Sequence, residues 1–67
     1  MIKIFGKENC SKCESLKKIL EDKKIEFQYS KNLKELMIVA SKARIMSAPV
    51  VEYNGKFLTM ENFLEVI

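Results

Sequence analysis

The stretch that decides the fold covers residues 2–20 and reads IKIFGKENCSKCESLKKIL. Residues 1–5 are rich in β-favouring side chains and end at Gly6, which predicts a strand. Residues 11–24 place apolar side chains at helical spacing between charged positions, and this pattern predicts an amphipathic helix. Asn9, in the polar loop between the two segments, is a candidate cap for that helix. The stretch therefore has the form of the first half of a β-α-β unit.

The next two segments repeat this alternation of strand and helix. Residues 25–30 alternate apolar and polar side chains, which predicts a second strand. Residues 33–43 again have apolar side chains at helical spacing, so we expect a second amphipathic helix with Asn32 as its cap. Met37 lies on the apolar stripe of this helix, and we expect it in the core.

Asn54-Gly55 is the strongest turn signal in the chain. Apolar residues flank it on both sides, so residues 50–53 and 56–59 are predicted to form an antiparallel hairpin. We expect Tyr53 and Phe57 to pair with each other across this hairpin.

Residues 60–67 are predicted to form a short final helix. The resulting order, β-α-β-α-β-β-α, indicates an α/β fold with a four-stranded mixed sheet in one domain spanning residues 1–67. The first two strands should be parallel, because a helix connects them, and the last two antiparallel. A chain of 67 residues has room for one small core and no second domain.

The composition argues against several classes of protein. With 48% hydrophobic and 31% charged residues, the chain is neither disordered nor fibrous. Its longest apolar run, residues 36–40, is too short to cross a bilayer, and its N-terminus lacks the pattern of a signal peptide. We therefore expect a cytoplasmic monomer without a membrane partner. A net charge of +3 with interspersed carboxylates does not indicate a nucleic-acid partner either.

Cys10-Ser11-Lys12-Cys13 contains both cysteines, at the point where the loop passes into the first helix. Unpaired N–H groups and the positive end of the helix dipole favour a thiolate at Cys10. Lys7 and Lys12 add positive charge nearby. Cys13 lies one turn later, within reach of Cys10 but more shielded, so we expect Cys10 to attack a disulfide and Cys13 to resolve the product. Such a pair beside a β-α-β unit is typical of a redox-active site.

Other roles for the two cysteines stay open. A structural zinc site needs about four ligands, and a chain with two cysteines and no histidine would have to share the metal with a second copy. A permanent disulfide would close a very short loop and gain little stability. The fold could also serve as a redox-inert adaptor that binds a partner near Pro49.

Ser47-Ala48-Pro49-Val50-Val51 is the second informative segment, because a proline here enters the third predicted strand from a loop. Together with the cysteine pair and the order of elements, it resembles the thioredoxin superfamily, and the small size is similar to its glutaredoxin and NrdH-redoxin branch. The resemblance covers essentially the whole chain. It implies a minimal thioredoxin fold and a dithiol thiol-disulfide oxidoreductase that reduces protein disulfides.

The resemblance also implies roles for individual residues. Lys7 matches the glutaredoxin lysine that meets a carboxylate of glutathione, and Pro49 matches the cis-proline of the family. Ala48 matches the residue whose backbone meets a bound disulfide peptide. We expect these three residues, with Lys12, to bind substrate, and we expect no metal and no bound cofactor.

Two segments depart from the glutaredoxin pattern. Ser11-Lys12 replaces the usual Pro-Tyr between the cysteines, so that a flexible cation takes the place of an aromatic wall. Thr59-Met60-Glu61-Asn62 falls where the family has two glycines and an aspartate next to glutathione. Electrons are therefore expected either from glutathione or from NADPH through thioredoxin reductase.

Overall fold

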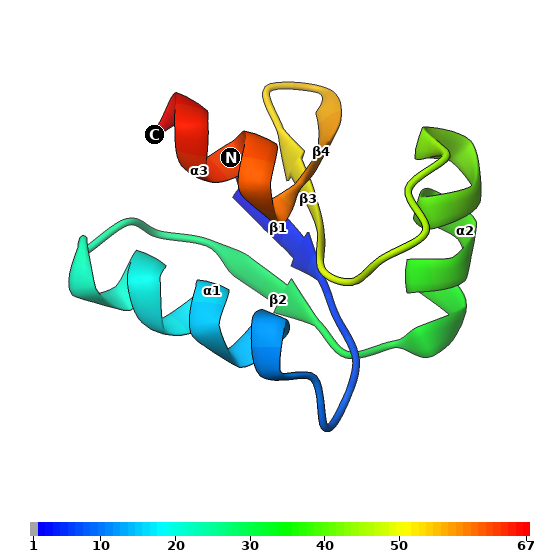
Figure 1. The fold of residues 1–67 in the computed structure, drawn as a ribbon, viewed down its shortest axis with the longest axis horizontal. Coiled ribbons are helices and arrows are strands. Elements are labelled where there is room, and N and C mark those ends of the chain that lie inside the picture. Colours follow the sequence, from blue (N-terminus) through cyan, green and yellow to red (C-terminus); the bar gives the residue numbers. More distant parts are fainter. Residues whose placement is uncertain (1) are drawn as a thin grey trace.

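The computed structural model describes residues 2–67, and its elements follow the predicted order (Figure 1). They are β1 (Ile2–Phe5), α1 (Ser11–Asp22), β2 (Gln28–Ser30), α2 (Leu33–Ala43), β3 (Val50–Tyr53), β4 (Lys56–Thr59) and α3 (Met60–Val66). The prediction of a β-α-β-α-β-β-α fold is confirmed. Met1, expected in the first strand, lies outside the described residues.

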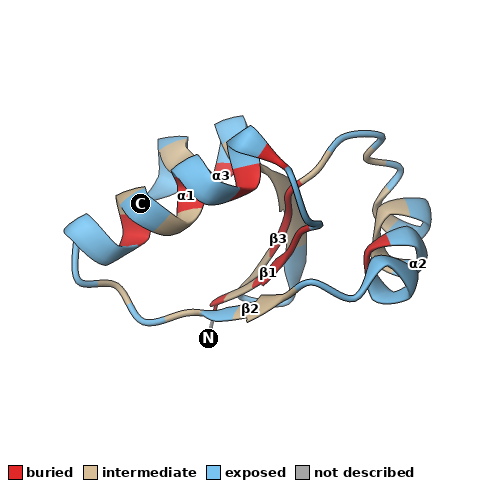
Figure 2. Ribbon diagram, turned by 90° about the horizontal axis from the view of Figure 1, so that it is seen from below, coloured by how far each residue is buried: buried red, intermediate tan, exposed pale blue. Residues whose placement is uncertain are grey.

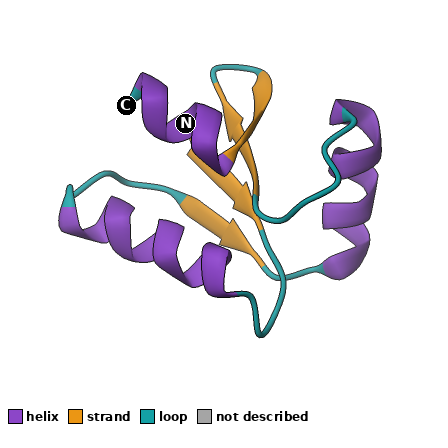
Figure 3. Cartoon of the chain, in the orientation of Figure 1, coloured by secondary structure: helices purple, strands orange, loops and turns teal. Residues whose placement is uncertain are grey.

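The four strands form one mixed sheet in the order β2-β1-β3-β4. β1 and β2 are parallel, whereas β3 is antiparallel to both β1 and β4. Phe5 at the end of β1 pairs with Val50 at the start of β3. The loop that leaves β1 and the loop that enters β3 therefore meet at one end of the sheet (Figure 3).

Helices cover both faces of the sheet, with α1 and α3 on one side and α2 on the other (Figure 2). Since neighbouring residues of a strand point to opposite faces, β1 and β3 contribute to two separate clusters. The larger cluster lies under α1 and α3 and consists of Ile2, Ile4, Leu16, Leu20, Val51 and Phe63. The smaller cluster lies under α2 and consists of Phe5, Leu36 and Val50.

α2 buries fewer apolar side chains against the sheet than the sequence predicts. Met37 was expected in the core, but its side chain is 64% exposed, and Leu36 is the buried residue of this helix. Val39 and Ala40 pack beside Leu36. The apolar stripe is wide enough to be presented to the sheet at more than one angle, and the helix is rotated so that Met37 faces solvent.

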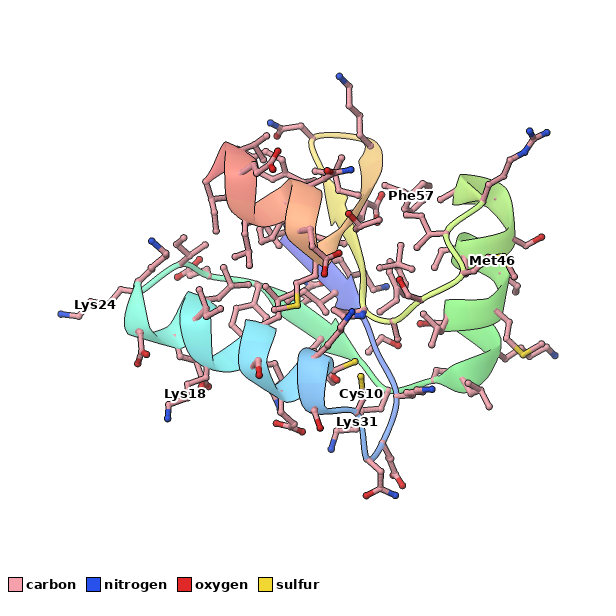
Figure 4. The ribbon with its side chains drawn as sticks, in the orientation of Figure 1. Cys10, Lys18, Lys24, Lys31, Met46 and Phe57 are labelled. Atoms are coloured by element: carbon pink, nitrogen blue, oxygen red, sulfur yellow. The ribbon has the colours of Figure 1, made fainter. Side chains whose placement is uncertain are left out.

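Two further expectations about the strands are wrong. The second strand is limited to Gln28–Ser30, because β1 is short and pairs with three residues only. Tyr53 and Phe57 do not pair, since Tyr53 is opposite Lys56. Tyr53 meets Phe63 edge-on at 5.6 Å between ring centroids, in the larger cluster. Phe57 belongs to the other cluster and points toward α2 (Figure 4).

Candidate functional site: the Cys10–Cys13 pair

Cys10 caps the first helix with its own sulfur. Its backbone is extended, with φ −114° and ψ 108°, and its Sγ accepts a hydrogen bond of 3.2 Å from the backbone N–H of Cys13. Its carbonyl accepts the first helical hydrogen bond, from the N–H of Glu14. The prediction that Asn9 caps the helix is wrong. Asn9 instead has a φ of 56°, a left-handed conformation that asparagine adopts more readily than most residues.

The two thiols differ in accessibility. Both are free, so the structure shows the dithiol form. Cys10 is 9% exposed and lies at the start of α1 (Figure 4). It borders a shallow surface hollow together with Asn9, Ser11 and Glu14. Cys13 is fully buried. Cys10 is therefore the more accessible of the two thiols, and Cys13 is shielded from solvent.

The side chain of Cys13 packs beside Gly6, which follows β1, and near Tyr29 of β2. A Cβ atom at Gly6 would be 3.0 Å from Cys13 Sγ and 2.9 Å from Tyr29 Cζ, and it would also contact the Tyr29 hydroxyl. Gly6 is needed here for space, because these two side chains occupy the volume of a side chain at this position. Burial raises the pKa of the Cys13 thiol, and the sulfur of Cys10 adds to that effect, whereas the backbone of Lys7 and the Tyr29 hydroxyl act in the opposite direction.

The Ala48–Pro49 peptide lies at the same end of the sheet and is cis. Pro49 is fully buried, and it directly precedes Val50, the partner of Phe5. Ala48 and Lys7 line one surface groove, so the structure brings together two of the residues expected to bind substrate. The rest of the groove is mostly apolar and consists of Leu33, Leu36, Met37, Ala40, Ile45, Met46 and Ser47.

Lys12 lies elsewhere. Its Nζ is 3.7 Å from a carboxylate oxygen of Glu61, so that its charge bridges α1 and α3. Both side chains are more than half exposed, and such a pair contributes little stability. The structure therefore does not bring Lys12 into the groove that Lys7 and Ala48 share.

The segment at the start of α3 already has structural contacts. Thr59 caps the helix, and its Oγ1 accepts a hydrogen bond of 3.1 Å from the backbone N–H of Asn62. Met60 packs against the larger core cluster. These side chains fill positions where the resemblance to glutaredoxins implies glycine.

The remaining possibilities for ligands are limited. Within residues 2–67, no group of three or more His, Cys, Asp or Glu side chains is arranged to hold a metal ion. No helix in that range has both the length and the apolar character needed to cross a membrane.

The comparison with protein families agrees with this geometry. A family model described as Glutaredoxin matches residues 2–58. The chain belongs to the glutaredoxin family. No curated protein sequence matches this glutaredoxin-family chain significantly. The glutaredoxins are a family of thiol-disulfide oxidoreductases, and the Cys10–Cys13 pair of this member has the Cys-x-x-Cys spacing at the start of its first helix.

Two residues of the site in this glutaredoxin-family protein were not predicted from its sequence. Gly6 was interpreted only as the end of a strand, and Tyr29 only as an apolar position of the second strand. A signal for Tyr29 exists, because parallel pairing of the first two strands places it opposite Ile4, on the face that α1 covers. The register of the β1–β2 pair determines which of the two thiols the Tyr29 ring contacts, and the sequence pattern does not specify this register.

Proposed function

We propose that this protein is a small dithiol thiol-disulfide oxidoreductase that reduces disulfides of protein substrates. The observation that supports this most strongly is the arrangement of the two free cysteines at the start of α1. The sulfur of Cys10 accepts a hydrogen bond from the N–H of Cys13, and Cys10 borders a surface hollow, whereas Cys13 is fully buried. A hydrogen bond to a sulfur that becomes a thiolate strengthens as the charge develops, because bonds to charged groups are stronger than neutral ones.

The reaction proceeds in two exchange steps. In the first, the Cys10 thiolate attacks one sulfur of the substrate disulfide, forms a mixed disulfide, and releases the other substrate sulfur as a thiolate that takes up a proton. In the second, Cys13 loses its proton and attacks Cys10. The Cys10–Cys13 disulfide forms, and the second substrate sulfur leaves and is protonated. The substrate gains two electrons, and the dithiol loses two.

The groove lined by Lys7 and Ala48 provides a site for the polypeptide that carries the disulfide. Lys7 contributes one cation to its lining. Met37 and Met46 are 64% and 101% exposed, and flexible methionines at a surface fit partners of varied shape. Met46 lies in the loop that follows α2 (Figure 4). The chemistry of the groove suits an extended, mainly apolar segment.

An external donor must restore the dithiol after each cycle. Within the glutaredoxin family this donor is glutathione, or a reductase in those members that depend on thioredoxin reductase. In either case the protein itself needs no bound cofactor, because the electrons enter and leave through the two sulfurs.

Reduction of a peptide disulfide by the reduced protein tests this proposal. The wild-type protein should reduce the disulfide and end as an internally oxidised monomer, whereas Cys10→Ser should show no reaction. Ser15→Ala, a change at an exposed position of α1 outside the Cys-x-x-Cys motif, is the matched control and should react as the wild type does. Full activity of Cys10→Ser would contradict the role of Cys10 as nucleophile, and a wild-type protein inert toward every disulfide offered would favour a redox-inert adaptor.

A further inference from the structure

The Tyr29 hydroxyl is a buried polar atom without a hydrogen-bond partner among residues 2–67. Buried polar groups are nearly always paired, since leaving one unpaired forfeits the hydrogen bonds that water would make. An unpaired hydroxyl beside a reactive group calls for an explanation in that group's chemistry.

The atom next to this hydroxyl is the sulfur of Cys13. Both lie against the same point, the position of the missing Cβ at Gly6, at the junction of β1, β2 and α1. The two groups also shift each other's titration, because the hydroxyl lowers the pKa of Cys13, and Cys13, after burial, raises the pKa of Tyr29.

The ring of Tyr29 is fixed from several sides. Tyr29 is opposite Ile4 in the parallel pair and packs against the larger core cluster. Lys17 Nζ lies 4.6 Å from the ring centroid, and its own side chain is held by Glu14 at 3.9 Å. A ring held in this way keeps its hydroxyl directed at one place.

We propose that Tyr29 is a positioning residue for the second exchange step, in which its hydroxyl donates a hydrogen bond to Cys13 Sγ as that sulfur becomes a thiolate. This inference rests on the proposed function and assigns a role to a residue outside the Cys-x-x-Cys motif. In the resting dithiol the hydroxyl lacks a good acceptor, because a thiol sulfur is a weak one. The acceptor appears when Cys13 loses its proton, and the bond then strengthens as charge develops.

A hydrogen-bond donor to Cys13 Sγ matters because the surroundings of this sulfur disfavour its charged form. Burial disfavours its thiolate, and so does the sulfur of Cys10 at the start of α1. Burial, and after it the two sulfurs and Glu14, raise the pKa of Tyr29, so the phenol keeps its proton near neutral pH and remains a donor. Lys17 is the cation that faces the ring, and on the β1 side the backbone of Lys7 supports the thiolate.

The test separates the two exchange steps in time. Reduced protein is mixed with an aromatic disulfide whose halves absorb light when released. Attack by Cys10 releases the first half, and attack by Cys13 releases the second. Tyr29→Phe keeps the ring and removes the hydroxyl. It should leave the first phase unchanged, slow the second roughly tenfold or more, and move the pH midpoint of the second phase upward.

Tyr53→Phe is the matched control, because it removes a tyrosine hydroxyl at the other end of the sheet and should leave both phases unchanged. Cys13→Ser should release only the first half. A Tyr29→Phe protein whose second phase keeps the wild-type rate and pH midpoint overturns the role of Tyr29 alone. A wild-type protein that never releases the second half overturns the two-step function itself.

Discussion

The backbone N–H of Cys13 donates a hydrogen bond of 3.2 Å to the sulfur of Cys10, so that one sulfur is both the cap of α1 and the candidate nucleophile. Substitutions at Cys10 can separate its role as helix cap from its role as nucleophile. Serine is a strong helix cap but a poor nucleophile without a base, whereas alanine can do neither.

Cys10→Ser should therefore leave the free energy of unfolding close to that of the wild type while abolishing disulfide reduction. Cys10→Ala should abolish reduction and also lose about 1 kcal/mol of stability with the cap. Urea unfolding of the reduced proteins measures the difference. If both variants are equally stable, the sulfur of Cys10 does not act as a cap.

The stability of the reduced protein should fall at alkaline pH. Burial raises the pKa of Cys13 above its ordinary 9.0, so above that pH the unfolded chain releases this proton while the folded chain still holds it. The unfolded state then binds fewer protons, and the free energy of unfolding decreases as pH rises. The contribution is fully present below about pH 9 and is lost as pH passes the folded value.

Unfolding of the reduced wild type and of Cys13→Ala at about pH 7.5 and about pH 10 checks this prediction. Cys13→Ala should be less stable at both values because of its cavity, yet it should lose less stability on going from the lower pH to the higher. An equal loss in both proteins would show that Cys13 does not contribute to the pH dependence.

Gly6→Ala should destabilise the protein by about 1–3 kcal/mol, because its Cβ would meet Tyr29 and Cys13 in a packed interior. Thermal unfolding of the reduced protein measures the loss. Adding Tyr29→Phe to Gly6→Ala removes the nearest of the contacting atoms and should restore part of the stability. A Gly6→Ala protein as stable as the wild type would mean that Tyr29 and Cys13 do not fill this space.

The choice of electron donor depends on the start of α3. Thr59 and Met60 place side chains where a bound glutathione would need backbone N–H groups, and the N–H of Asn62 is already taken by Thr59. We therefore expect faster turnover with NADPH and thioredoxin reductase than with NADPH, glutathione and glutathione reductase. Both systems are compared on one protein disulfide substrate.

The variant Thr59→Gly/Met60→Gly tests the cause of this preference. It should gain turnover with glutathione, and its turnover with thioredoxin reductase should stay near the wild-type value. A wild-type protein that turns over equally well with glutathione would show that the Lys7 groove holds the tripeptide despite these side chains.

Much of this fold follows from local pattern, because each element carries its own signal. The spacing of apolar residues predicts α1 and α2, and Asn54-Gly55 predicts the hairpin. The exposure of Met37 could not be predicted in this way, since helical periodicity does not specify the angle at which a helix meets its sheet.

The residues of the candidate site also fall into two groups, those with a local signal in the sequence and those that only tertiary packing brings together. Cys10 and Cys13 are three residues apart in a motif, so the sequence predicts that they meet. Tyr29 lies beside Cys13 because of the register of the β1–β2 pair. Lys12 pairs with Glu61 because the start of α3 lies close to α1. Contacts of this kind arise from tertiary packing and have no local signature.

The most direct test of the central claim uses Cys13→Ser, which should stop the reaction after the first exchange step. The reduced variant is mixed with a peptide that contains one disulfide, and the product is digested and examined by mass spectrometry without reductant. We expect a mixed disulfide between the peptide and Cys10, absent from Cys10→Ser. A peptide left unreacted, or bound equally well by Cys13 in Cys10→Ser, would contradict it.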